Sequence, residues 1–239
     1  MIRGAAIQRL DHDPEFSWRG DSVTRIENLS DIVFALAFGM LVSASAPPQT
    51  FPDLGEFLVS IVPVTAAFAL MVGLWNSHFT FFRRYGLADG WIVFLNAVLL
   101  FIVLYIAYPL RFAFDGFFGY ILLVFGAPER VEAMQIGYRE SGIIMAYFTI
   151  GYGAIHLLFT MMYAHALSRK DMLSLNATEI AISRRSLAIA LFAALLSFAI
   201  AGVALMTPLY GFAGFFMLLI LPAGWLIGRL MRPPASAPD

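Results

Sequence analysis

Strongly polar side chains interrupt the hydrophobic segments of this 239-residue chain, chiefly in its first half. Those that stand at the start of such a segment or inside it are Arg25, Ser30, Asp31, Trp75, His78, Asp89 and Asn96. Ionisable groups are costly in a bilayer and face protein or water, so they mark candidate sites of interhelical bonding or of ion and proton movement. They form no nucleophile–base pair and no phosphate-binding loop, and we therefore do not expect an enzyme.

A metal centre is not expected either. His156 and His165 lie nine residues apart on one predicted helix and share a face, but two histidines alone make no strong metal site. The chain has no cysteine, which removes thiolate ligands and disulfides. Its net charge of −1 provides no basic field for nucleic acid. We expect no metal and no bound cofactor.

The composition indicates that lipid surrounds most of the chain. Hydrophobic residues make up 60% of it and charged residues 13%, with a mean hydropathy of +0.79. Soluble domains carry about 25% charged residues. Apolar stretches of spanning length cover residues 26–46, 54–82, 87–108, 141–167, 186–206 and 209–230. These stretches predict an all-α, polytopic membrane protein with six transmembrane helices.

The region between the third and fourth stretches is predicted to be an outer loop over residues 115–140. The third helix is expected to end near Pro109 and Arg111. The apolar piece 117–125 is too short to span and is interpreted as interfacial or re-entrant.

Basic residues set the expected orientation. With the N-terminus in the cytoplasm, all 15 of them lie inside except Arg111, Arg130 and Arg139. Both termini are then cytoplasmic. Residues 1–24 form an N-terminal segment without the apolar core of a signal peptide, so the first span is expected to stay uncleaved. Residues 25–230 form the membrane domain, and residues 231–239 form a proline-rich cytoplasmic tail.

The first span carries an apolar stripe. At about 100° per residue, Ile32, Leu36, Met40 and Ser43 fall on one narrow strip of the helix, with Gly39 beside it. Gly39 allows close backbone approach. The stripe fits contact with lipid, packing in the core, or a place on a symmetry axis.

The polar residues of the first span are expected on another face, because Asp31 points about 140° away from Leu36. One arrangement packs Arg25, Ser30 and Asp31 against the second and third helices. Their partners there would be His78, Asp89 and Asn96. Simpler readings also stand: Arg25 as a snorkelling anchor, Ser30 and Asp31 as a helix N-cap, and His78 as a hydrogen-bonding residue.

These residues resemble a known family. Arg25-x-x-x-Leu29-Ser30-Asp31 is similar to the Arg-x-x-x-Phe-Ser-Asp signature of the transmembrane protein 175 family of potassium channels. Trp75-x-x-His78 in the second span, and Asp89 with Asn96 in the third, look similar too. The resemblance covers residues 25–109. Leu29 replaces the phenylalanine of the signature, which alters local packing.

The resemblance implies a single-repeat, prokaryotic member of the family that assembles as a homotetramer in the plasma membrane. Its pore would be lined by the first helix of each subunit, with an apolar constriction formed by Leu36, Gly39, Met40 and Ser43. K⁺ and other monovalent cations would be the permeant ions. The signature residues would hold the first helix against the second and third.

Two other functions remain open at this point. A proton-coupled secondary transporter would use Asp31, His78 and Asp89 as its relay. A non-conducting membrane partner subunit would use the same helices for assembly only.

Overall fold

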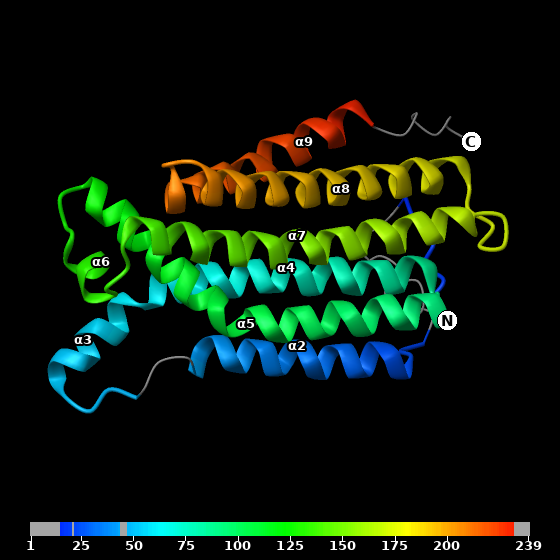
Figure 1. Ribbon diagram of the computed structural model, residues 1–239. Coiled ribbons are helices and arrows are strands. Elements are labelled where there is room, and N and C mark those ends of the chain that lie inside the picture. Colours follow the sequence, from blue (N-terminus) through cyan, green and yellow to red (C-terminus); the bar gives the residue numbers. More distant parts are fainter. Residues whose placement is uncertain (1–14, 21, 44–46, 232–239) are drawn as a thin grey trace.

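The protein is a bundle of long helices (Figure 1), seen in a computed structural model that describes residues 15–20, 22–43 and 47–231. The described helices are α2 (Arg25–Ser43), α3 (Phe51–Val59), α4 (Ile61–Tyr85), α5 (Gly90–Val124), α6 (Glu129–Ala133), α7 (Tyr138–Ser168), α8 (Ala177–Met206), η1 (Tyr210–Leu219) and α9 (Ile220–Leu230). Six segments are long and apolar enough to cross a membrane, the sixth being η1 and α9 together. This confirms the all-α fold with six spans. The N-terminal residues 1–14, the end of the first predicted span at 44–46 and the tail 232–239 lie outside the described residues.

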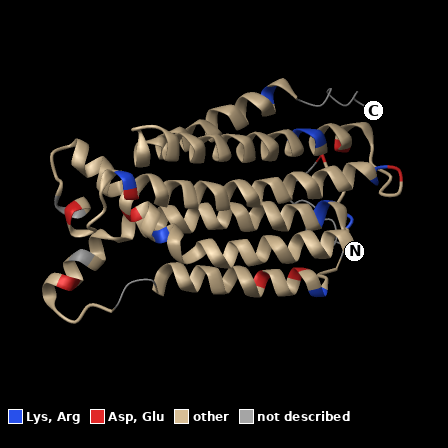
Figure 2. Cartoon of the chain, in the orientation of Figure 1, with Lys and Arg blue, Asp and Glu red and all other residues tan. Residues whose placement is uncertain are grey.

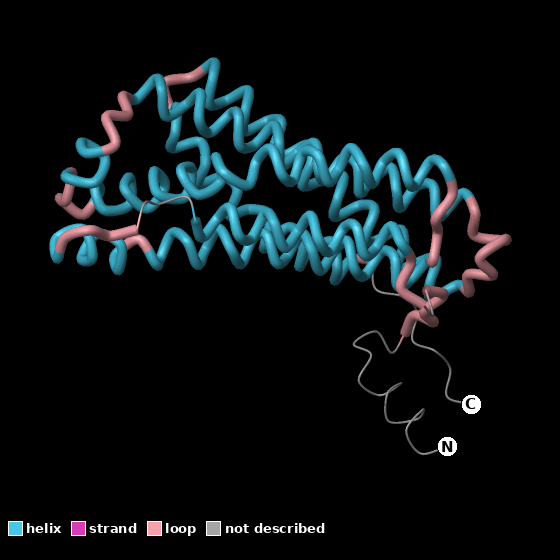
Figure 3. Tube along the Cα trace, turned by 90° about the horizontal axis from the view of Figure 1, so that it is seen from below, coloured by secondary structure: helices cyan, strands magenta, loops and turns pink. Residues whose placement is uncertain are grey.

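Charged residues gather at the two ends of the bundle, and its middle is almost free of them (Figure 2). The side chains of a membrane protein must meet hydrocarbon over about 30 Å of its length, which accounts for this distribution. Seen from a perpendicular direction, the long helices run along one axis and most loops lie at the two ends (Figure 3).

The third span differs from the prediction. Helix α5 is 35 residues long and continues through Pro109. The apolar piece 117–125, predicted to be a separate short segment, therefore forms the last turns of this helix. Proline removes one helical hydrogen bond and bends a helix, but a membrane helix tolerates it where neighbours support the backbone. Figure 1 shows the change of direction along α5. Arg111 therefore lies inside a helix, and the predicted outer loop is shorter and contains α6.

Three other spans differ at their boundaries. The second is broken at Ser60, between α3 and α4. The fifth begins at Ala177, because Asn176 and Glu179 form a capping box that starts α8 well before its apolar stretch. In the sixth, the first ten residues form the 3₁₀ helix η1.

The bundle consists of two halves, α2, α4 and α5 in the first and α7, α8, η1 and α9 in the second, joined mainly where α5 packs on α7. The closest pair is α7 with α8, where small residues let the backbones approach. A Cβ on Gly142 would lie 2.6 Å from the carbonyl oxygen of Ala204, and one on Gly153 would lie 3.1 Å from Ser197.

A short segment at the described N-terminus, residues 15–20, ties the two halves together, and we call it the N-terminal strap. Phe16 is buried against Tyr85 at the end of α4. The Arg19 guanidinium contacts the buried Glu179 carboxylate of α8 at 2.8 Å. The backbone N–H of Arg19 donates to the carbonyl of Arg83 on α4 at 3.1 Å. The strap leads directly into α2, so this helix starts from a fixed point.

Candidate functional site

Helix α2 begins with a reciprocal cap. The Glu27 N–H donates to the Thr24 hydroxyl at 3.3 Å, and the Thr24 N–H donates to the Glu27 carboxylate at 3.3 Å. Such an arrangement satisfies two backbone donors that have no partner in the first turn. Ser30 and Asp31 therefore lie inside α2, and the N-cap interpretation of these two residues is wrong.

A chain of buried hydrogen bonds joins α2 to α4 and α5. The Asn96 amide N–H of α5 donates to the Ser30 hydroxyl at 3.0 Å, and Ser30 donates to the carbonyl of Ile26 at 2.8 Å. The Asn96 amide oxygen is 2.8 Å from Nε2 of His78 on α4, so this nitrogen carries the proton. The three side chains are 0–2% exposed. Their polar groups are thus paired across three helices, which fixes the rotation of α2 about its axis.

A second interhelical bond lies at the edge of this chain. The Trp75 indole N–H of α4 donates to the Asp31 carboxylate at 2.9 Å. Asp31 itself is exposed, and Trp75 stacks on Phe79 with ring centroids 5.7 Å apart. Five of the residues singled out from the sequence are therefore brought together on one side of α2: Ser30, Asp31, Trp75, His78 and Asn96.

The structure adds a buried ion pair that sequence reasoning missed. The Glu27 carboxylate is 3.0 Å from the guanidinium of Arg83 at the end of α4, and both side chains are largely buried. Arg83 also donates to the carbonyl of Gly20 in the N-terminal strap at 2.8 Å. In the sequence, Arg83 was only one of the basic residues expected on the cytoplasmic side. A carboxylate at the mouth of a span calls for a cation, and this was the available signal.

The opposite face of α2 is exposed. Leu36 lies six residues after Ser30, which places it about 240° around the helix from the buried chain. The side chains of Ile32 and Leu36 are 66% and 55% exposed, Met40 is half-buried, and Gly39 and Ser43 are exposed. No described atom lies within 4 Å of a Cβ placed on Gly39. This apolar face has no neighbour among the described residues of its own chain, and it is free to meet lipid or another subunit.

Arg25 lies on this exposed face. It stands eleven residues before Leu36, so the two side chains lie within about 20° of each other around the helix. Arg25 is exposed, and no hydrogen bond or ion pair joins it to another described residue. Leu29 is also exposed, at 56%. Arg25 therefore does not hold α2 against α4 and α5 within one chain, unlike the predicted arrangement.

Asp89 also departs from the predicted arrangement. It precedes α5, where its carboxylate caps the helix by accepting from the N–H groups of Trp91 and Ile92. It lies two helical turns, or about 10 Å, from Asn96, too far to join that chain. Its other oxygen is 2.7 Å from Nε2 of His165 on α7. Burial acts to raise the pKa of Asp89, but the His165 bond and the two backbone bonds outweigh it, and its pKa is lowered.

Arg111, predicted to lie in the outer loop, is instead buried at 5% exposure beside the last turn of α2. Its guanidinium donates to the carbonyls of Leu41 and Val42 at 3.4 and 3.5 Å. It also donates to the Ser60 hydroxyl at 3.2 Å and lies 3.6 Å from the Asp115 carboxylate. A cation at these carbonyls complements the C-terminal end of the α2 dipole. Both ends of α2 are therefore anchored by arginines of neighbouring helices.

Comparisons with known proteins identify the family. The sequence profile of the family described as "Endosomal/lysosomal potassium channel TMEM175" matches residues 25–106. A protein of Marivirga tractuosa named "Potassium channel" is 37% identical over 185 residues, which are 73% of this chain and 72% of that protein. The crystal structure of a variant of the potassium channel MtTMEM175, in complex with a nanobody fusion protein, superposes with a TM-score of 0.74. That chain is 33% identical, and the match covers 91% of this chain and 97% of that one. On the strength of these matches, the chain belongs to the TMEM175 family of potassium channels.

Proposed function

We propose that this chain is one subunit of a K⁺-permeable cation channel, in which helix α2 of each of four subunits lines the pore. Membership of a potassium channel family supports K⁺ conduction. The observation that carries the pore assignment is the two-sided character of α2. One side is bonded to α4 and α5, and the other leaves Leu36 and its neighbours on the helix exposed in the part of the chain that the structure describes.

Assembly around a common axis accounts for the exposed stripe. The described residues of each chain contain a single set of six candidate spans. Four copies of α2, placed with their exposed faces inward, bring Leu36, Met40 and Ser43 from every subunit to one axis. The buried bonds on the other side of α2 then hold that orientation against rotation. The same faces bring four Arg25 side chains to the cytoplasmic end of the axis, where K⁺ remains hydrated.

An apolar ring at Leu36 is the proposed constriction. Such a ring gates by dewetting, because an ion that enters it loses hydration and finds no carbonyl oxygens in replacement. Met40 is unbranched and adapts its rotamers, so it widens or narrows the path one turn further along. Gly39 gives the helices room to approach, and Ser43 offers hydroxyl groups near the outer mouth. Selectivity is then modest compared with that of a carbonyl-lined filter.

The proposed location is a plasma membrane of prokaryotic type, with both termini in the cytoplasm. Arg83 and Arg84 lie at the end of α4, Arg169 and Lys170 follow α7, and Arg184 and Arg185 lie in the first turns of α8. Figure 2 shows Lys and Arg on several elements at the end of the bundle that holds the start of α2. Basic residues favour the cytoplasmic side of a membrane. The α3–α4 and α5–α6 connections lie at the other end of the bundle (Figure 1) and then face outward.

The test is a K⁺ flux assay on the purified protein in liposomes, with Leu36→Asn as the diagnostic variant. Asparagine hydrates the ring and lowers the dewetting barrier, so we expect a higher K⁺ flux than in the wild type. Leu195→Asn is the matched control, because Leu195 is similarly exposed, at 60%, but lies on α8 in the second half of the bundle. It should leave the flux unchanged.

Three results of this assay would contradict the proposal. If Leu36→Asn and wild type conduct equally, Leu36 does not form the constriction. If K⁺ uptake saturates and follows an imposed pH gradient, the chain is a proton-coupled transporter instead. Absence of flux in correctly inserted protein would favour a non-conducting partner subunit.

A further inference from the structure

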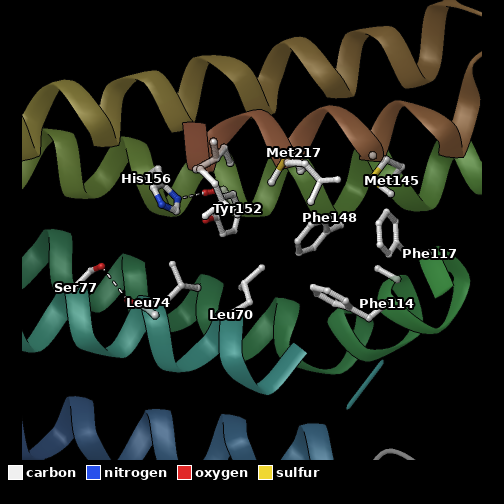
Figure 4. Close-up of a pocket in the computed structure, with 16 residues that line it drawn as sticks. Leu70, Leu74, Ser77, Phe114, Phe117, Met145, Phe148, Tyr152, His156 and Met217 are labelled. Carbon is white, nitrogen blue, oxygen red and sulfur yellow. Dashed lines mark hydrogen bonds between the residues drawn. The ribbon is translucent and has the colours of Figure 1, made fainter. Parts of the chain in front are cut away.

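A cavity of about 450 Å³ separates α4 of the first half from α7, η1 and α9 of the second (Figure 4). All of its lining residues belong to membrane-spanning helices, with α5 closing one side. Cavities of this size hold small organic ligands. It lies away from the exposed face of α2 and forms no part of the proposed pore.

The two ends of the cavity differ in character. One end is lined by rings and thioethers, from Phe114, Phe117, Met145, Phe148 and Met217 (Figure 4). The other end holds Ser77 of α4 and, across from it, Tyr152 and His156 of α7 (Figure 4). An occupant that fits this lining is apolar over most of its length and polar at one end.

The hydrogen bonds at the polar end specify what that end must offer. Nδ1 of His156 lies 3.0 Å from the backbone carbonyl of Tyr152, and a carbonyl only accepts, so Nδ1 carries the proton. In the neutral ring, Nε2 is then an acceptor. The Ser77 hydroxyl already donates to the carbonyl of Gly73 at 2.9 Å. Neither Nε2 of His156 nor the Tyr152 hydroxyl bonds to any other described residue.

Unpaired polar groups are costly inside a bundle of membrane-spanning helices, because hydrocarbon offers them no hydrogen bonds. A hydroxyl group satisfies both of them, because it donates to Nε2 of His156 and accepts from the phenol of Tyr152. A carboxylate lacks the required donor, and a plain acyl chain offers neither function. The bilayer is the phase that meets these helices, so the ligand comes from it.

We propose that this cavity binds a neutral, hydroxyl-bearing amphiphile from the bilayer. Its hydroxyl group lies between Tyr152 and His156, and its chain lies along the phenylalanines and methionines toward α5. The occupant also contacts Leu74 and Ser77, which lie on the same turns of α4 as Trp75 and His78. It thereby fills the seam between the two halves.

The proposal is tested by photolabelling the full-length protein in liposomes with two probes. One is a long-chain primary alcohol that carries a diazirine, and the other is the alkane of equal length with the same diazirine. Mass spectrometry locates the adducts. We expect adducts on α7 near Tyr152 and His156, with the alcohol favoured over the alkane by about 25-fold, which is about fivefold for each of the two hydrogen bonds at about 1 kcal/mol apiece.

Four variants separate the cavity from unspecific labelling. Gly73→Leu should abolish the adducts, because open space surrounds a Cβ there and the new side chain fills the cavity. Gly202→Leu on α8 is equally unhindered but lies outside the cavity, so it should label like the wild type. His156→Phe and Tyr152→Phe each remove one of the two hydrogen bonds and should each cut the preference for the alcohol to about fivefold.

Equal labelling of the wild type by both probes would overturn the proposal, since the site would then hold only an acyl chain. Labelling that survives Gly73→Leu would also overturn it. So would adducts that link two copies of the chain through these residues, because the cavity would then be filled by a second subunit. The readout requires no ion flux, so it stands apart from the fate of the channel proposal.

Discussion

In the first half of the molecule, a chain of buried polar side chains bonds from helix to helix, whereas the buried hydroxyls midway along α7 and α8 donate to carbonyls of their own helix. Ser30, His78 and Asn96 join α2, α4 and α5. In contrast, Thr149 donates to the carbonyl of Met145, and Ser197 donates to the carbonyl of Ala193. Helices α7 and α8 hold together instead by close contact at glycines. The first half thus defines the rotation of a helix, and the second half provides a tightly packed support.

The largest expected effect is the loss of stability when the Glu27–Arg83 ion pair at the start of α2 is broken. Glu27→Gln leaves the guanidinium of Arg83 buried without its counter-charge, and breaking such a pair costs about 3 to 5 kcal/mol. Unfolding in mixed micelles under increasing denaturing detergent measures the loss. Arg184→Met is the control, because Arg184 is an exposed cation near the same end of the bundle, and it should change the unfolding free energy by less than about 0.5 kcal/mol.

A double variant makes the comparison sharper. Glu27→Met with Arg83→Met replaces both charges with apolar side chains and should recover most of the stability lost in the single variants. The loss of unfolding free energy in the double variant could instead equal the sum of the losses in Glu27→Met and Arg83→Met. The two groups would then not be coupled, and the pair would not anchor α2.

The next effect concerns the buried chain of hydrogen bonds. Asn96→Leu leaves Ser30 without its donor and His78 without its acceptor, at about 1 to 3 kcal/mol for each group. The same unfolding assay is used, with Ser197→Ala as the control in the second half. Ser197 bonds the carbonyl of its own helix, so its loss should be nearly neutral. Equal losses in both variants would remove the distinction between the halves.

Close packing in the second half provides the converse test. Gly142→Ala places a methyl group 2.6 Å from the carbonyl oxygen of Ala204, so α7 and α8 must separate, at a cost of about 1 to 3 kcal/mol. Gly202→Ala on α8 meets no atom within 4 Å and should be neutral or slightly stabilising. Thermal unfolding distinguishes the two variants, and a stable Gly142→Ala protein would show that the backbones do not approach this closely.

The smallest effect is a pH dependence at the junction of the halves. The pKa of Asp89 is lowered in the folded protein, so its carboxylate stabilises the fold above the unfolded pKa of about 3.9. This contribution is lost as the pH falls through the lower, folded pKa. Below pH 4, wild type should therefore lose more stability than Asp89→Asn. Parallel pH profiles of the two proteins would show that the His165 contact contributes nothing.

Composition and hydropathy were sufficient to predict the class of fold, because a bilayer requires long apolar helices wherever the chain crosses it. The same rules misplaced Pro109 and Arg111. Proline ends most helices in water, but here α5 passes through it and carries Arg111 to the carbonyls at the end of α2. That contact depends on how α5 bends, which no local pattern encodes.

The candidate site was predictable in part. Ser30, His78 and Asn96 were identified as partners because polar side chains in three apolar segments have few other places to go. Asp89 was assigned to the same cluster, but its partner His165 lies 76 residues away on α7. Arg25 was grouped with Ser30 although helical phase places it with Leu36. The partner of Asp89 depends on how α7 packs beside α5, which the sequence does not show. The face of Arg25 could have been read from its spacing to Leu36.

The most direct test of the central claim is a cysteine scan of α2, since the chain has no cysteine of its own. Single cysteines at Ile32, Leu36, Gly39 and Ser43 would be compared with cysteines at Phe34, Ala37 and Leu41, which are buried. A positively charged thiol reagent is added while K⁺ flux is recorded from liposomes. The account predicts block at the first set and none at the second. Conduction that no position on the exposed face can block would contradict a pore lined by α2.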